Sequence, residues 1–109
     1  MISEAMVEEA LHYLLNSAAA DAQAKANADY TGEWRKTERA RLTMESEMKT
    51  AAGKAADAES HDEYLAALDV WKLAVYEDCR RRFLREAKAT LIEAWRTQES
   101  TRRSLGTLA

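Results

Sequence analysis

The 109-residue chain contains no proline and only three glycines. Turns and irregular loops draw heavily on these two residues, so a chain that nearly lacks them is unlike a β-rich or loop-rich protein. Alanine, glutamate, arginine, lysine and leucine dominate the sequence, and these residues favour helix. The sequence therefore predicts an all-α fold, and its length suits one domain spanning residues 1–109.

Two long helices are expected, over about residues 4–50 and 61–105. Ser3 is a suitable N-cap for the first helix. Whether Gly32 divides that helix stays open. The stretch AAGKAADAES (51–60) has no apolar stripe and is interpreted as the connection. Ser60 and Glu63 have the spacing of a capping box at the start of the second helix.

Charge changes sign in blocks along the chain. Residues 1–34 carry six acids and one base, and residues 35–54 carry six bases and three acids. Residues 55–69 carry five acids and no lysine or arginine, and residues 70–109 carry nine bases and five acids. Folding the chain back about residue 56 places opposite signs side by side, which predicts an antiparallel hairpin. The same match could arise between two chains.

The second helix has two partly apolar sides. One side is predicted to form the core, and its members are Leu65, Leu68, Val75, Tyr76, Cys79, Phe83, Ala87 and Ala94. The other side includes Ile92 and Trp95. Because a lone hairpin buries one side of each helix, we expect a homo-oligomer: a dimer forming a four-helix bundle, or a larger helical assembly.

The run YEDCRRRFLREAK (76–88) raises the question of nucleic-acid binding. Basic side chains can bind phosphate groups, and a tryptophan ring can stack on a nucleobase. The candidate nucleic-acid or partner contacts are Arg81, Arg85, Lys88, Ile92, Trp95, Arg102 and Arg103. The alternative is a helix face neutralised within the protein, which the net charge of −3 favours.

No pattern for catalysis, a cofactor or a metal stands out. His12 and His61 lack the further ligands that a metal site needs, and Cys79 is interpreted as a core residue. We therefore expect no enzyme activity. A single cysteine and the lack of an apolar run of bilayer-spanning length suit a protein of the cytoplasm, without a membrane partner.

Two blocks resemble a family of small all-helical bacteriophage and prophage proteins: KANADYTGEWRKTERARLTMES (25–46) and HDEYLAALDVWKLAVYEDCRRRFLREAKATLIEAWRTQESTRR (61–103). The matching positions are Tyr30, Glu33, Trp34, Arg35, Lys36, His61, Glu63, Tyr64, Glu93, Trp95, Arg96 and Thr97. Genes of this family often lie near those of DNA recombination or replication.

The resemblance implies an accessory protein in the cytoplasm of a bacterial host. It would act in viral DNA recombination or replication by protein–protein interaction, as an oligomeric scaffold or recruiter. The alternatives are direct DNA binding through the Arg81, Arg85, Lys88 and Trp95 face, and inhibition of a bacterial defence or host protein.

Overall fold

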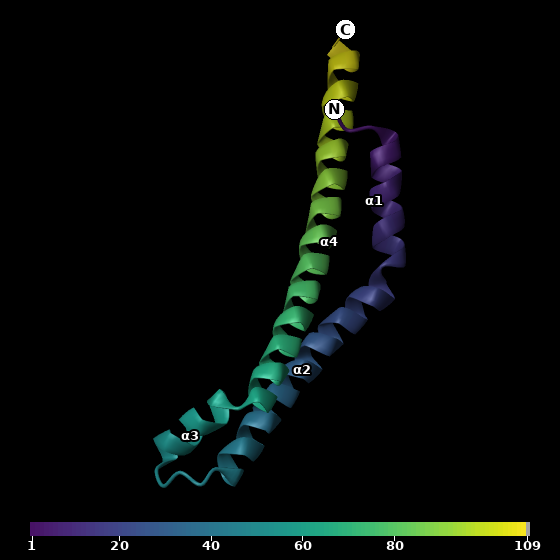
Figure 1. Cartoon of the computed structure of the whole chain (residues 1–109). Helices are drawn as coiled ribbons and strands as arrows, with labels where there is room; N and C mark the ends of the chain where they lie inside the picture. The colour runs from purple at the N-terminus through teal and green to yellow at the C-terminus, as the bar shows by residue number, and fades with distance from the viewer. Residues whose placement is uncertain (109) are drawn as a thin grey trace. The chain divides into compact units, whose positions relative to one another are not determined.

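The computed structural model describes residues 1–108, which form four helices and no strand (Figure 1). The helices are α1 (Glu4–Asn16), α2 (Ala18–Glu45), α3 (Ala51–Ser60) and α4 (Asp62–Leu108). The predicted all-α fold is confirmed. Within this described part, no helix combines the length and the apolar character that crossing a membrane requires.

The chain groups into two compact units. Unit 1 contains Met1–Asp21 and the chain from Arg80 onward, and unit 2 contains Ala22–Cys79. The helices α2 and α4 each contribute residues to both units.

The first predicted helix is divided at Ser17, and Gly32 lies inside the continuous α2. Asn16 and Ser17 account for the break. The Asn16 side-chain amide donates to the His12 carbonyl at 2.7 Å, a bond that competes with the backbone ladder of the helix. The predicted N-cap is confirmed, because the Ser3 hydroxyl accepts from the Met6 N–H at 3.2 Å.

Residues 51–60, interpreted as the connection between two long helices, form a helix of their own, α3. Alanine suffices for helix here, and Thr50 caps the helix by accepting from the Gly53 N–H at 3.0 Å. The predicted Ser60 capping box does not form. Ser60 ends α3 and its hydroxyl donates to the Asp57 carbonyl, while Glu63 pairs with Arg41.

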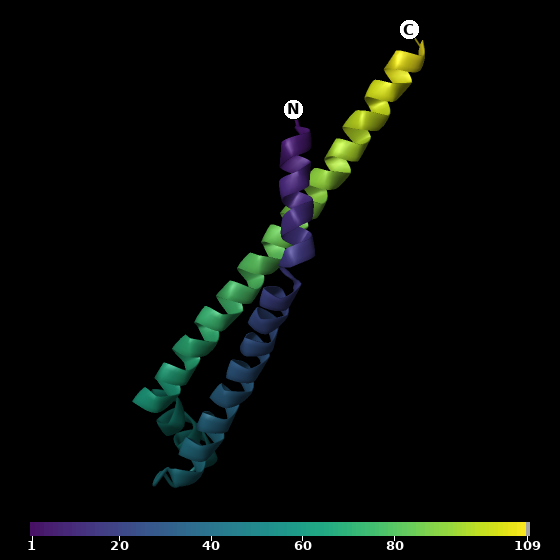
Figure 2. The same cartoon turned by 90° about the vertical axis from the view of Figure 1, so that its right-hand side faces the viewer.

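In unit 1, α1 runs antiparallel to the later part of α4 (Figures 1 and 2). Near one end the Ile2 N–H donates to Gln98 Oε1 at 3.3 Å, and Gln98 Nε2 donates to the Ile2 carbonyl at 3.1 Å. Farther along, Glu9 pairs with Lys88 and Asp21 pairs with Arg81. Acidic and basic segments thus face each other within one chain, as their signs predict.

In unit 2, α2 runs beside the first part of α4, and α3 packs where they meet (Figure 1). Leu42, Ala58 and Tyr64 are buried together, one from each helix, with Leu68 packed against them. Arg39 pairs with Glu59 at 2.9 Å, and Arg41 pairs with Glu63. The predicted pairing of the basic 35–54 segment with acids of 57–77 is therefore present. The predicted turn about residue 56 is not, since α3 occupies that stretch.

Buried and half-buried positions recur every three or four residues, the spacing of helices packed along a heptad pattern. On α1 and the first turn of α2 they include Val7, Ala10, Leu14, Ser17 and Asp21, and on α2 in unit 2 they include Ala24, Ala28, Thr31, Arg35, Glu38 and Leu42. On α4 they include Tyr64, Ala67, Trp71, Ala74, Asp78, Arg81, Arg85, Lys88, Ile92, Trp95 and Glu99.

The predicted core side of α4 is therefore largely wrong. Leu65, Tyr76 and Phe83 are 44%, 67% and 62% exposed. Leu68, Val75 and Cys79 are half-buried at the edge of the packed side. The packed side carries several charges, which are acceptable there because opposite charges on the facing helix neutralise them.

Gly32 allows α2 to approach Trp71 closely. A Cβ at Gly32 would lie 3.0 Å from Trp71 Nε1. The Arg35 guanidinium lies 4.4 Å from the centre of the Trp71 ring, a cation–π contact. The Trp71 indole thus packs against the α2 backbone at Gly32 and also contacts the Arg35 guanidinium.

We predict that Gly32→Ala lowers the free energy of unfolding. Alanine adds about 1 kcal/mol of helix propensity, but displacing a packed ring costs about 1–3 kcal/mol. Denaturant unfolding followed by circular dichroism measures the change.

Gly106→Ala is the matched control, because nothing lies within 4 Å of a Cβ added at Gly106. It should leave stability unchanged or slightly raised. A Gly32→Ala protein as stable as Gly106→Ala would contradict the close packing of Trp71.

Candidate partner-binding surfaces

Three of the predicted basic contact residues form ion pairs with the N-terminal segment of unit 1, two with Asp21 in the first turn of α2 and one with Glu9 of α1. Asp21 Oδ1 lies 3.4 Å from Arg81 Nη1 and 3.2 Å from Arg85 Nη1. Lys88 Nζ lies 3.5 Å from Glu9 Oε1 and 5.8 Å from the centre of the Tyr13 ring. In unit 1 this part of the basic run therefore packs against acidic and aromatic groups of the same chain.

Asp21 is the most buried carboxylate of this interface, at 7% exposure. Burial acts to raise the pKa of its carboxyl group, but the Ser17 hydroxyl and the guanidinium groups of Arg81 and Arg85 favour the charged form. The net result is a lowered pKa for Asp21. The ionised carboxylate is thus the form that the folded unit stabilises.

The other four predicted contact residues have different surroundings. Ile92 is half-buried on the packed side of α4. Trp95 is also half-buried and lines a hollow with Glu4, Val7, Glu8 and Leu11 of α1. Arg102 pairs with Glu99 at 2.7 Å, and Arg103 is exposed. Five of the seven residues are thus half-buried on the packed side of α4, and the two near its end are exposed.

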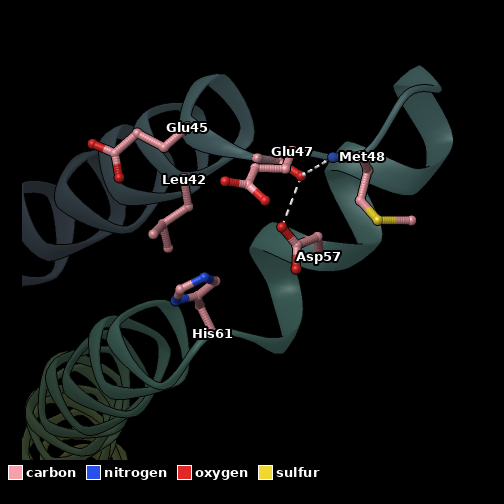
Figure 3. Close-up of a pocket in the computed structure, with 7 residues that line it drawn as sticks. Leu42, Glu45, Glu47, Met48, Asp57 and His61 are labelled. Carbon is pink, nitrogen blue, oxygen red and sulfur yellow. Dashed lines mark hydrogen bonds between the residues drawn. The ribbon is translucent and has the colours of Figure 1, made fainter.

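A second hollow lies where α2 and α3 meet, in unit 2 (Figure 3). Its lining includes Glu45, Glu47, Asp57 and His61. The Ser46 hydroxyl donates to Asp57 Oδ2 at 2.7 Å and accepts from the Met48 N–H at 3.2 Å. Asp57 and Ser46 thus organise the turn that leads from α2 to α3.

The histidines and the cysteine do not converge. His12 is exposed beside Asn16, whose amide nitrogen lies 3.3 Å from His12 Nδ1. His61 is exposed in the α2–α3 hollow, and Cys79 is half-buried on α4. Over residues 1–108, no three His, Cys, Asp or Glu side chains are grouped so that they could hold a metal ion.

Unit 2 presents a surface that the sequence analysis did not identify. We call it the aromatic face, and it consists of Tyr30, Trp34, Val70 and Leu73. Their exposures are 69%, 46%, 51% and 71%. The surface is notable because all four side chains lie on one flank of the α2–α4 pair.

The Arg41–Glu63 ion pair locates this flank. Trp34 precedes Arg41 by seven residues and Val70 follows Glu63 by seven, so each lies two helical turns away on the same side of its helix. Tyr30 and Leu73 lie about one turn farther along. Gly32 and its neighbour Trp71 belong to the opposite flank, because Gly32 and Trp34 are about 200° apart around α2.

Sequence periodicity could not separate these residues from core residues. Tyr30 and Trp34 were conspicuous as aromatics, but aromatic residues at helical spacing usually belong to a core. The available signal was the heptad spacing of Ala28, Thr31, Arg35, Glu38 and Leu42, which places Tyr30 and Trp34 beside the packed positions. That spacing is hard to recognise because polar residues occupy much of it.

Comparison with known proteins gave no match at any level: no family model, no curated protein and no solved structure is similar to this chain.

We predict that Asp21 makes stability depend on pH. Because its pKa is lower in the folded state, its contribution is present above the unfolded pKa of about 3.9 and is lost as the pH falls through the folded value. Asp21→Asn should cost about 1–3 kcal/mol at pH 7, below the usual cost for a fully buried pair because both arginines are partly exposed.

Unfolding of both proteins between pH 7 and pH 2 measures this effect, and the difference between them should shrink below about pH 4. Glu33→Gln is the control, since Glu33 forms only an exposed pair with Lys36 and should cost little at any pH. A constant difference between wild type and Asp21→Asn would contradict the role given to the carboxylate charge.

Proposed function

We propose that this protein acts by protein–protein interaction and that its aromatic face binds a second copy of the chain. The supporting observation is the exposure of Tyr30, Trp34, Val70 and Leu73 on one flank of unit 2. Aromatic residues are enriched at protein interfaces, where they form most of the energetically important contacts.

The same flank supplies small side chains next to the large ones. Ala26 and Thr37 of α2 are exposed, as is Ala66 of α4. Two copies related by a two-fold axis would present identical surfaces to each other, so the large residues of one could fill the spaces over the small residues of the other. This complementarity favours a second copy as the partner.

The size of the surface suits this proposal. A stable interface buries about 800 Å² from each partner, which four apolar side chains and their small neighbours can approach together. The product would be four packed helices, two from each copy, in the region of unit 2. Such an assembly is the simplest form of an oligomeric scaffold.

The biological setting proposed is the one implied by the resemblance to phage proteins, namely viral DNA recombination or replication. It rests on the resemblance alone. Direct DNA binding by the exposed protein is a weaker proposal, because Arg81, Arg85 and Lys88 already pair with carboxylates of residues 1–21. If the protein inhibits a host protein, that host protein would bind the aromatic face in place of a second copy of the chain.

We predict that the wild-type protein dimerises and that Leu73→Glu weakens self-association at least tenfold. A glutamate at the centre of an apolar contact must lose water without gaining a partner, which costs more than the 1.4 kcal/mol that a tenfold change requires. Sedimentation equilibrium over a concentration series measures the dissociation constant.

Leu15→Glu is the matched control. Leu15 is 80% exposed on α1, so the two variants make the same chemical change at similarly exposed leucines. Leu15→Glu should associate like wild type, and both variants should keep the helical circular dichroism. A monomeric wild-type protein, or a Leu73→Glu protein that dimerises normally, would contradict the proposal.

A further inference from the structure

The acidic N-terminal segment lies directly on the most basic stretch of α4. Residues 1–21 contain four acids and no lysine or arginine, whereas residues 80–92 contain five bases and one acid. Both segments belong to unit 1 and run side by side (Figures 1 and 2). Residues 1–21 therefore present negative charge to the basic residues 80–92, as a phosphate backbone would.

The individual contacts also resemble those of a nucleic acid. The Asp21 carboxylate occupies the place of a phosphate between Arg81 and Arg85, and the Glu9 carboxylate does so beside Lys88. The Tyr13 ring lies against Lys88 as a base can lie against a cation.

Trp95 extends this basic surface. It follows Lys88 by seven residues and so lies on the same side of α4, two turns away. In the folded unit it lines the hollow next to Val7 and Leu11. Without α1, its indole ring would be open for stacking against a nucleobase.

The contacts that hold α1 in place are weak. Val7 and Ala10 are its only buried residues, and no large side chain in the described chain is fully buried. Asp21 Oδ2 is buried without a hydrogen-bond partner, which lowers the stability of the interface. Ser17 separates α1 from α2, and Asp21 lies in the first turn of α2, so displacement of residues 1–21 disrupts α2 only at its first turn.

We infer that residues 1–21, which comprise α1 and the first turn of α2, are an internal cover over a phosphate-binding face of α4. That face is formed by Arg81, Arg85, Lys88 and Trp95, and its ligand is single-stranded nucleic acid. Displacement of residues 1–21 exchanges the carboxylates of Glu9 and Asp21 for phosphates on the same cations. This inference concerns unit 1 and is independent of self-association through the aromatic face of unit 2.

The test compares full-length variants binding a fluorescently labelled 20-nucleotide oligothymidylate, measured by anisotropy at 50 mM salt. Glu9→Gln/Asp21→Asn, which weakens the cover, should bind at least ten times more tightly than wild type. Its affinity should fall with salt with a log–log slope of about −2, as three phosphate contacts on a single strand require. Adding Lys88→Glu should abolish the gain.

Asp29→Asn/Glu33→Gln is the matched control, since it removes one Asp and one Glu charge from exposed pairs of unit 2. It should bind like wild type. If it gains as much as Glu9→Gln/Asp21→Asn, or if neither variant gains, the cover does not exist.

A second arm keeps the test decisive should the first variant unfold. Ile2→Cys/Gln98→Cys, made with Cys79→Ala, places two thiols where α1 meets α4. Joining them with a short bis-maleimide should weaken oligothymidylate binding at least tenfold relative to the unlinked protein. Equal binding by linked and unlinked protein would overturn the inference.

Discussion

Opposite charges on antiparallel helices are the interaction on which this structure depends. Asp21 meets Arg81 and Arg85 in unit 1, and Arg41 meets Glu63 in unit 2. Exposed pairs contribute only about 0–1 kcal/mol each, and few apolar side chains are buried. The charges therefore matter chiefly for specificity, because a shifted register would bring like charges together. Alanine at the packed positions lets the helices come close enough for these pairs to form.

The sequence predicts the helices and the sign of each pairing well, because proline content and charge blocks are properties of segments. It predicts the packed side of α4 poorly. Leu65, Tyr76 and Phe83 have core-like spacing yet are exposed, whereas Arg81, Arg85 and Lys88 are half-buried. Predicting a core from hydrophobic spacing requires charged side chains to face water. This requirement is not met on α4, where opposite charges on the facing helix neutralise the charged side chains of the packed side. The helix α3 was missed for a related reason, since Thr50 and a run of alanines form it without an apolar stripe.

A charged packed side leaves large apolar residues on the outside. In unit 2, Tyr30, Trp34, Val70 and Leu73 gather on one flank and provide the aromatic face on which the proposed function rests. In unit 1, the charged packed side of α4 places the carboxylates of Glu9 and Asp21 on cations that are equally suited to phosphates. Both proposals thus follow from one property of the chain, namely that its helices recognise each other by charge and not by a large apolar core.

The double-mutant cycle between Asp21 and Arg85 tests this property most directly. Unfolding free energies of wild type, Asp21→Ala, Arg85→Ala and the double variant give the coupling between the two side chains. Charge recognition between the first turn of α2 and α4 predicts a favourable coupling of about 1 kcal/mol or more at low salt, decreasing as salt is added. Additive effects of the two substitutions, with no change on adding salt, would contradict the account.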